Sequence, residues 1–470
     1  MIVAERFLKK LKRKFKKAAP RFELGIKDLQ SSALPLGHAA NGAFSNHHID
    51  RNSNPAEILL VISNGHGEDL IALRVITELH KLNPNIAFKV LPLVGEGKIF
   101  LKAIQDGWIE QVGFFNRLPS GGFSNQSVKA FFADIFAGLF TNTWNQWKIM
   151  RAQSNSRTRI LAVGDLLPLL FAWSSGIAFA FIGTPKSDYT WRSGPFNSFS
   201  DYYHRIKGSE WDPWECLIMK SSMCKLVAVR DKLTARGLRS WGVTAQSFGN
   251  PMMDGFSKTN IPTPLMNYRR LILLCGSRSP EALRNFLNLI QSLNYLNNDG
   301  KIAIFVALGG EPKYTEIENI LIQYDYRKES LNDTNIDCDS FWKKDSNYLF
   351  VGQGKFNLWA QWAEIGIATA GTATEQLVGL GKPVLSLPGR GPQFTYGFAK
   401  RQSRLLGGSV LVCKNKQILA RKLYLLMSNS LIRRYLGEIG RNRMGPYGGS
   451  FALARNISKK LFLNTTLSDI

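Results

Sequence analysis

Short apolar runs alternate with amphipathic helical patterns along most of the chain. In the first half, the apolar runs cover residues 58–63, 89–95, 160–165, 177–183 and 226–230. A polar, proline-containing break at 257–267 is followed by further runs at 271–277, 302–310, 348–352, 366–371 and 383–389. Continuous apolar strands separated by helices are typical of parallel sheets that are buried on both faces. The pattern therefore predicts two doubly wound α/β domains joined by one linker.

The length of 470 residues suits two such domains with tails to spare. We expect a basic N-terminal segment and linker at 1–55, a first Rossmann-like domain at 56–262 and a second domain at 263–435. Residues 436–470 are predicted to be helical and to cross back to the first domain. In open parallel sheets, ligands bind beyond the carboxyl ends of the strands, so the candidate chemistry is sought there.

Three segments have membrane-like patterns. Residues 1–17 combine eight basic side chains with apolar positions at helical spacing, which predicts a helix on an anionic membrane surface, a disordered tail or a targeting peptide. Residues 166–185 are uncharged, but Ser174-Ser175-Gly176 divides them, which favours a buried helix and strand over a membrane span. An aromatic stripe at 131–147 fits either the bilayer interface or a helix packed on the sheet.

The net charge of +25 indicates attraction to a polyanion such as an anionic bilayer, nucleic acid or a phosphorylated substrate. No nucleic-acid-binding motif is present, which argues against nucleic acid as a partner. Five cysteines without framework spacing indicate a reducing compartment and no zinc site. Asp337-Cys338-Asp339 has the DxD pattern of some metal-dependent sugar transferases, but the polar stretch at 328–345 favours a solvated loop. We expect no metal or other cofactor.

Polar and titratable residues follow two predicted strands of the first domain. The first strand leads into Asn-Gly-His-Gly-Glu-Asp at 64–69, where glycines allow a ligand to approach a helix start and His66 can titrate. Helix capping alone could explain Asp69. Asp165 follows another strand beside apolar residues, which fits either a general base with a raised pKa or a helix cap.

The second domain carries two phosphate-like motifs after predicted strands. In the first, Arg278 follows Gly276 and Ser277, so that a guanidinium lies beside backbone amides that could bind a diphosphate. In the second, residues 370–376 form a turn of small residues at a helix start, where Glu375 could accept both hydroxyls of a ribose.

The pattern GT-x-x-E, helix, G-K-P-V and a Gly/Pro loop resembles the nucleotide-sugar half of GT-B-fold glycosyltransferases. Within these, the chain is most similar to lipid-A-disaccharide synthases and their relatives, through Gly-Ser-Arg at 276–278 and the Pro-Gln-Phe-Thr-Tyr-Gly-Phe-Ala-Lys-Arg run at 392–401. The likeness runs from about residue 57 to 455 and is specific only in the second domain. The motifs at 64–69 and 164–168 depart from the family, and both changes fall on the acceptor side.

The resemblance implies a GT-B fold whose two domains face each other across a cleft. It implies transfer of a sugar, of N-acetylglucosamine type, from a UDP-sugar to a membrane lipid acceptor. The enzyme would be inverting and peripheral on the cytoplasmic face of a membrane, with Asp165 or His66 as the base. Donor binding is then expected from Gly276, Ser277, Arg278, Gly354, Gly371, Thr372, Ala373, Glu375, Gln376 and Gln393. The acceptor loop would comprise Asn64, Gly65, Gly67, Glu68 and Asp69.

Two other functions remain open. A UDP-N-acetylglucosamine 2-epimerase resembles this fold and its glycine and glutamate motif, but would not need the basic N-terminal segment. A membrane-binding protein on a transferase scaffold would have no catalytic activity.

Overall fold

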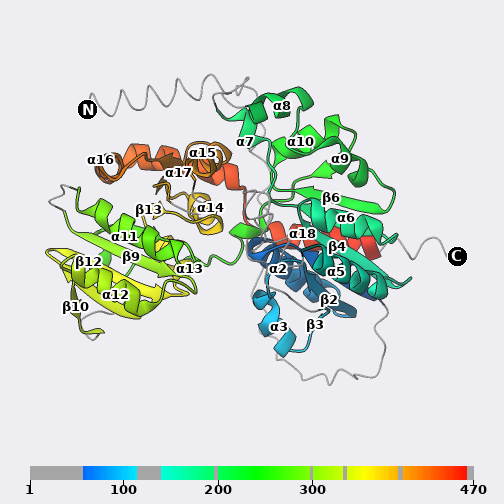
Figure 1. The fold of residues 1–470 in the computed structure, drawn as a ribbon, viewed down its shortest axis with the longest axis horizontal. Coiled ribbons are helices and arrows are strands. Elements are labelled where there is room, and N and C mark those ends of the chain that lie inside the picture. Colours follow the sequence, from blue (N-terminus) through cyan, green and yellow to red (C-terminus); the bar gives the residue numbers. More distant parts are fainter. Residues whose placement is uncertain are drawn as a thin grey trace, which may run out of the picture.

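The computed structural model describes residues 57–113, 139–194, 199–296, 300–331, 336–389 and 395–462. They form two α/β units, each built on its own sheet (Figure 1). The predicted surface helix at 1–17 and the first part of the aromatic stripe, 131–138, lie outside these ranges.

The first sheet is parallel throughout, in the order β3-β2-β1-β4-β5-β6-β7. Its strands are β1 (Glu57–Ser63), β2 (Ile86–Pro92), β3 (Ile109–Gln111), β4 (Thr158–Gly164), β5 (Phe179–Gly183), β6 (Cys224–Val229) and β7 (Ala245–Gln246). Its helices are α2 (His66–Leu82), α3 (Leu101–Gln105), α5 (Leu139–Gln153), α6 (Leu166–Ser174), α7 (Tyr189–Arg192), α8 (Phe199–Lys207), α9 (Pro213–Met219) and α10 (Lys232–Ser240). Helices α5, α6, α9 and α10 pack on one face of the sheet, and α2 and α3 pack on the other.

The second sheet has the order β10-β11-β12-β9-β8-β13-β14-β15. Its strands are β8 (Arg269–Leu274), β9 (Ile302–Leu308), β10 (Arg327–Glu329), β11 (Ser340–Lys344), β12 (Asn347–Gln353), β13 (Ile365–Ala368), β14 (Val384–Ser386) and β15 (Val410–Val412). Its helices are α11 (Glu281–Leu293), α12 (Tyr314–Gln323), α13 (Phe356–Trp362), α14 (Thr372–Gly379), α15 (Tyr396–Leu405), α16 (Lys416–Ser428) and α17 (Ser430–Met444). Strand β11 is antiparallel to both of its neighbours, and the other pairs are parallel.

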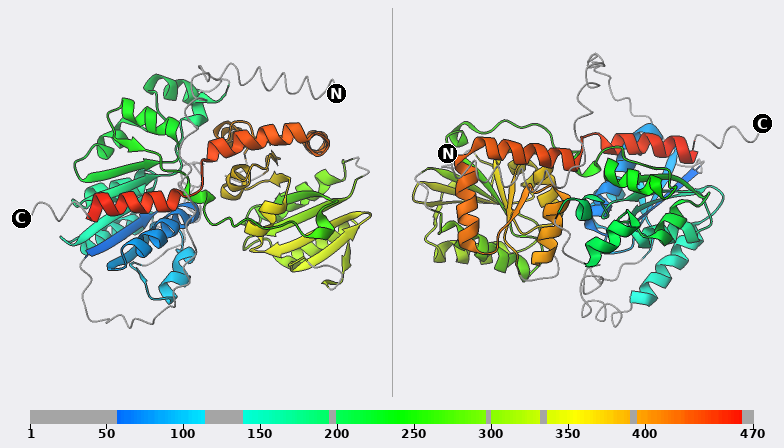
Figure 2. Two further views of the ribbon diagram at one scale, coloured as in Figure 1. Left: turned by 180° about the vertical axis from the view of Figure 1, so that it is seen from behind. Right: turned by 90° about the horizontal axis from the view of Figure 1, so that it is seen from above.

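After α17 the chain returns to the first unit. Helix α18 (Gly449–Ile457) packs along α2, with Leu453, Ala454 and Ile457 buried (Figure 2). Asp254, in the connection between the two units, accepts hydrogen bonds from the backbone N–H groups of Gly448 and Ser450 at 2.6 and 2.7 Å. These bonds fix the start of α18.

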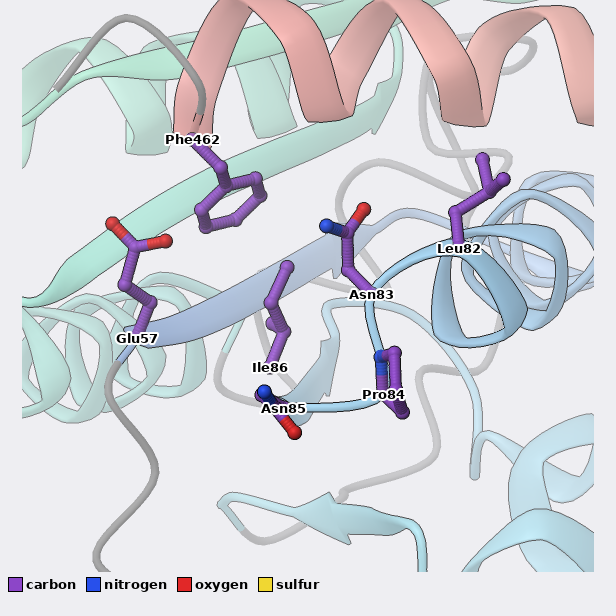
Figure 3. A pocket seen from close by; sticks show the side chains of 7 residues that line it. All are labelled: Glu57, Leu82, Asn83, Pro84, Asn85, Ile86 and Phe462. Atoms are coloured by element: carbon purple, nitrogen blue, oxygen red, sulfur yellow. The ribbon is translucent and has the colours of Figure 1, made fainter. Parts of the chain in front are cut away.

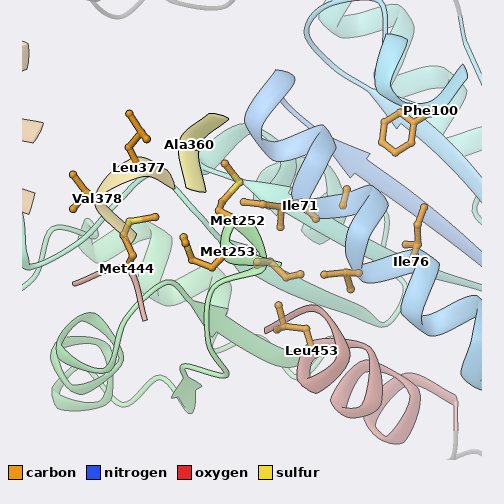
Figure 4. Packing of buried hydrophobic residues seen from close by; sticks show 14 of the residues in the cluster. Ile71, Ile76, Phe100, Met252, Met253, Ala360, Leu377, Val378, Met444 and Leu453 are labelled. Carbon is orange, nitrogen blue, oxygen red and sulfur yellow. The ribbon is translucent and has the colours of Figure 1, made fainter. Parts of the chain in front are cut away.

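One hydrophobic cluster continues from the first unit into the second. Met252 and Met253, just after the first sheet, pack in it with Leu377 and Val378 of α14 and with Met444 (Figure 4). A side chain on Gly379 would come within 2.3 Å of the Met253 sulfur, so only glycine allows this close approach. The two units therefore share a hydrophobic interface.

These observations confirm the predicted fold of two doubly wound α/β domains. Residues 166–185 form α6 and β5, separated by a turn in which Gly176 has φ +76°, as predicted for a buried helix and strand. None of the helices in the described ranges combines the length and apolarity that crossing a bilayer requires.

The DxD-like residues 337–339 lie in the connection between β10 and β11, where Asp337 and Asp339 are exposed, as predicted for a solvated loop. The polar stretch 328–345 also contains two residues of β10 and all of β11, which the sequence pattern did not predict. Strand β11 escaped detection because only its first three residues are buried, with Trp342 packed in the core, while Lys343 is exposed.

Candidate active site

Polar side chains gather where four neighbouring strands of the first sheet end. Asn64 follows β1, Asp165 follows β4, Thr184 follows β5 and Arg230 follows β6. Because β1, β4, β5 and β6 are adjacent and parallel, their carboxyl ends form one edge of the sheet. The first turn of α2 adds Glu68 to this group.

Asp165 is held in place by two hydrogen bonds. Its Oδ1 accepts from Asn64 Nδ2 at 2.6 Å and from the backbone N–H of Leu167 at 3.2 Å, so Asp165 is the N-cap of α6. Burial raises the pKa of this carboxyl although both hydrogen bonds oppose the shift. Asp165 therefore has both properties that the sequence left as alternatives, a helix cap and a carboxyl with a raised pKa.

The approach of Asn64 to Asp165 depends on a glycine. Gly164 has φ +141°, and a side chain there would come within 1.9 Å of Asn64 Oδ1. The strand end thus leaves room for the Asn64 amide beside the carboxylate.

Glu68 lies in the same group. Its Oε1 accepts from the Thr184 hydroxyl at 3.1 Å. Burial raises its pKa, and the negative charges of Asp165 and Glu375 add to the rise. Two carboxyls with raised pKa, Glu68 and Asp165, thus lie at one sheet edge, an arrangement suited to general acid–base chemistry.

Asp69 is more deeply buried and points toward Ser63. Gly65 occupies the N-cap position of α2, so Asp69 lies in the first turn and does not cap the helix as the sequence suggested. Its Oδ1 accepts from the Ser63 hydroxyl at 2.6 Å, and only 1% of the residue is exposed. Burial raises the pKa of Asp69 from 3.8 to about 7.

We expect Asp69→Asn to reduce the dependence of stability on pH. The folded protein keeps the Asp69 proton up to about pH 7, whereas the unfolded chain loses it near 3.8. The stabilisation from this proton is complete below about pH 4 and is lost as the pH rises through about 7, and it amounts to at most about 4 kcal/mol. Urea unfolding at several pH values measures it. Asp337→Asn, which changes an exposed carboxylate, is the control. If the free energy of unfolding had the same dependence on pH in the native protein, Asp69→Asn and Asp337→Asn, the prediction would be contradicted.

The second domain brings the start of α14 to the same place. A methyl group on Gly67 would meet Thr372 Oγ1 at 3.4 Å, so the first turns of α2 and α14 face each other. Arg230 Nη2 lies 2.9 Å from Glu375 Oε2. The structure thus brings Glu375 close enough to Glu68 for its negative charge to add to the rise in the Glu68 pKa.

Other predicted donor residues take different positions around α14. The Gln376 side chain donates to the Met252 carbonyl at 3.0 Å and is buried in the connection between the domains. Gln402 of α15 donates to the Gly371 carbonyl at 3.1 Å and so fixes the turn before α14. Ala373 is half-buried in the first turn of the helix.

The other glycine motifs follow β8, which neighbours β13, and β12, which lies two strands beyond β8. Gly276, with φ +92°, follows β8 and directly precedes Ser277 and Arg278. Strand β8 pairs with β13. Gly354, with φ +71°, follows β12. Burial lowers the pKa of Arg278 while nearby Glu281 opposes the shift. Gly276, Arg278 and Gly354 thus follow the carboxyl ends of strands in the second sheet, the same edge at which α14 begins.

Two predicted residues cannot be placed in the site. The backbone of His66 begins α2, but its side chain lies outside the described part of the structure, as does Gln393. Their roles remain predictions.

The DxD-like residues have protein partners. Asp337 pairs with Lys355 at 2.5 Å, and Asp339 accepts from the backbone N–H of Gln353 at 2.7 Å. Within the described ranges, no three His, Cys, Asp or Glu side chains gather as a metal site would require.

Sequence reasoning missed Arg230 and Thr184. Arg230 precedes Asp231, whose carboxylate accepts from the Thr234 N–H and caps α10, so the pair looks like an ordinary helix start. The partner of Arg230 is 145 residues away and belongs to the other domain, and nothing in the local pattern indicates it.

A pocket of 260 Å³ lies at the opposite end of the first sheet (Figure 3). Glu57 at the start of β1, Ile86 at the start of β2, Leu82 and Phe462 are among its lining residues. No predicted site residue lines this pocket, so we do not assign the chemistry to it.

No protein-family model and no curated protein sequence matches the chain. Solved structures do. The S. aureus MnaA–UDP co-structure matches with a TM-score of 0.52 and 14% identity over 87% of this chain and 97% of its own. UDP-GlcNAc 2-epimerase from Neisseria meningitidis, bound to UDP-GlcNAc, matches with a TM-score of 0.47 and 16% identity over 86% and 100%. A glycosyltransferase from Rickettsia africae matches with a TM-score of 0.45 and 12% identity over 87% and 98%.

The first of these similarities shows that the two proteins share a fold across nearly the whole of both chains. Together with the two α/β sheets described above, this similarity confirms the predicted GT-B-like fold class.

Proposed function

We propose that the protein is a UDP-sugar enzyme that transfers a sugar, of N-acetylglucosamine type, to a hydroxyl of a membrane lipid. The observation that carries the proposal is the meeting of two carboxyls with raised pKa, Glu68 and Asp165, with the start of α14 and Glu375 from the other domain. A helix start suits a diphosphate, and a carboxylate in its first turn suits a ribose.

Each step of the proposed transfer is assigned to a residue named above. Asp165, with His66 as the alternative, would take the proton of the acceptor hydroxyl as that oxygen attacks the anomeric carbon. UDP leaves with the electrons of the broken bond to the sugar, and the α14 start and Arg278 stabilise its negative charge. Holding both substrates between the two domains supplies the positioning. Lipid-A-disaccharide synthases, which the sequence resembles, are the model for this reaction.

A lipid acceptor is supported by exposed apolar side chains on three helices of the first domain. Trp173 of α6, Trp214 and Leu217 of α9, and Ile206 of α8 are all exposed; we call this set the exposed aromatic face. Helix α6 packs on α9, and Tyr203 of α8 donates to Asp212 at the start of α9 at 3.1 Å, so the three helices are neighbours. Exposed aromatic residues on a protein with a net charge of +25 suit a peripheral position on an anionic membrane.

An epimerase is the second candidate, because two carboxyls at one site could also remove and return a proton on a sugar carbon. It would act on the UDP-sugar alone. The exposed aromatic face favours the transferase, since an epimerase has no lipid substrate.

The two candidates are separated by their products. We expect the protein, incubated with UDP-N-acetylglucosamine and a membrane lipid extract, to release free UDP and sugar-linked lipid in equal amounts. UDP should also protect the protein against thermal unfolding, by about 2.7 kcal/mol at 100 times its Kd, and AMP and GDP should not. Mass spectrometry and melting curves measure both.

A UDP-linked isomer of the sugar, formed without lipid, would identify the epimerase instead. Melting curves that UDP leaves unchanged would contradict both candidates.

A further inference from the structure

The two hydrogen bonds that hold the Asp165 carboxylate fall on the same oxygen. Asn64 Nδ2 donates to Asp165 Oδ1 at 2.6 Å, and the backbone N–H of Leu167 donates to the same atom at 3.2 Å. Among the groups that the structure describes, no other residue donates to Asp165 Oδ2. Unlike the carbonyl oxygen of Asn64, which is buried without a hydrogen-bond partner, Oδ2 keeps contact with solvent. One carboxylate oxygen is therefore fixed and the other is available.

The Asn64 amide is oriented by Asp165. The Asn64 carbonyl oxygen is buried and accepts no hydrogen bond from the described residues. Turning the amide over would set this oxygen against Asp165 Oδ1, and two acceptors need a proton between them. A buried carbonyl without a partner destabilises the fold, so packing alone does not explain an asparagine at this position.

The charged groups beside Asp165 come from neighbouring strand ends and from α2. Burial raises the pKa of Asp165, while the backbone N–H that it caps, Lys186 after β5, and Asn64 lower it. Burial also raises the pKa of Glu68 of α2, and the charge of Asp165 adds to that rise. The side chain of His66, at the start of α2, lies outside the described part of the chain. Asn64 is thus one of three groups that favour the charged form of Asp165.

We propose that Asn64 is a positioning residue that holds Asp165 through Oδ1 and leaves Oδ2 as the oxygen that takes the acceptor's proton. The proposal rests on the proposed function, because it takes a hydroxyl as the attacking group. The hydroxyl proton passes to Oδ2 as the hydroxyl oxygen forms its bond to the anomeric carbon. The bond from that carbon to UDP breaks, and its electron pair leaves on UDP. A donor on Oδ1 favours the charged carboxylate, which is the form that a base needs.

The test is the pH dependence of sugar transfer by the native protein and by Asn64→Ala, measured with UDP-N-acetylglucosamine and a membrane lipid extract. Loss of the donor disfavours the carboxylate, so the pH of half-maximal rate should rise by about one unit. The maximal rate at high pH should fall about tenfold, because the carboxylate is no longer oriented. Asn285→Ala is the matched control, since Asn285 also donates through Nδ2 near a strand end, to the Cys275 carbonyl at 3.2 Å. It should leave the pH of half-maximal rate unchanged.

Two results would overturn the proposal. A rate that falls by the same factor at every pH would show that Asn64 is only a structural contact. A maximal rate that rises would show that Asn64 blocks the oxygen that acts as the base, which would then be Oδ1. Asn64→Leu, which has the shape of asparagine without its donor, is used if Asn64→Ala does not fold.

A second measurement needs no turnover. Urea unfolding of the native protein, Asn64→Ala, Asp165→Asn and the double variant gives the coupling between the two side chains. An amide donates more strongly to a charged carboxylate than to a neutral one, so the coupling should grow as the pH rises through the Asp165 pKa. A coupling that is the same at every pH would also overturn the proposal. If the coupling grows but no sugar reaches a lipid at any pH, the contact is as described and the proposed function is wrong.

Discussion

Replacing Asp165 with asparagine is expected to lower the rate of sugar transfer by about 100- to 10,000-fold, the usual contribution of a positioned base. UDP affinity should change by less than about twofold, because the donor is expected to bind the other domain. Asparagine is itself a good N-cap, so its side-chain oxygen can still accept from the Leu167 N–H and α6 should remain folded. Initial rates with saturating donor and lipid extract measure the effect.

The pH profile gives a second signature of the base. Burial raises the pKa of Asp165, and a base must be deprotonated, so the rate of the native enzyme should rise with pH through that raised pKa. This rise should vanish in Asp165→Asn. A histidine base would give a rise nearer neutral pH, which His66→Ala would remove instead.

Asp231→Asn is the matched control. Asp231 also follows a strand, caps a helix and is buried, but its carboxylate accepts from Ser187 and Thr234. Its turnover should stay within about threefold of the native value. If Asp165→Asn and His66→Ala both keep full turnover, the base lies elsewhere, and Glu68 is the next group to test.

The double variant Trp214→Ser, Leu217→Ser is expected to reduce binding to anionic vesicles by about 10- to 100-fold. Trp214 is 53% exposed and Leu217 is 68% exposed on α9, and burial of such side chains in a membrane is worth about 1.5 to 3 kcal/mol each when complete. Vesicle flotation measures the effect. The remaining binding should come from residues 1–17 and should weaken as salt rises, because screening acts over about 8 Å at physiological ionic strength.

Deleting residues 1–17 should have the opposite signature, leaving vesicle binding that is weaker but less sensitive to salt. Tyr424→Ser, Leu431→Ser is the control, since both residues are equally exposed but lie on the second domain, on α16 and α17. Equal loss of binding in the control would show that the exposed aromatic face has no special role.

The sequence pattern predicts the central strands of both sheets but does not reveal the short strands near their edges. Strands such as β1 and β9 are buried on both faces and therefore read as continuous apolar runs. Strands β3, β7 and β10 are only two or three residues long and have exposed positions, so no periodic pattern can reveal them. Strand β11 alternates weakly and ends in two lysines.

The candidate site could likewise be predicted only in part. Asp165 and Glu375 could be found because each follows a buried strand and begins a helix, a position defined by local pattern. Whether these residues meet depends on how the two domains pack, which local pattern does not encode. Arg230 shows this most clearly, because its partner Glu375 belongs to the other domain.

The return of α18 to the first domain affects how the protein can fold during synthesis. The apolar side of α2, near the beginning of the described chain, is covered by Leu453, Ala454 and Ile457. A ribosome-bound chain from which β7 has emerged, but these residues have not, exposes that side to water although every strand of the first sheet is already present. The first domain therefore completes its core only after the second domain has been made, and protection of the nascent chain by a chaperone would matter most during that interval.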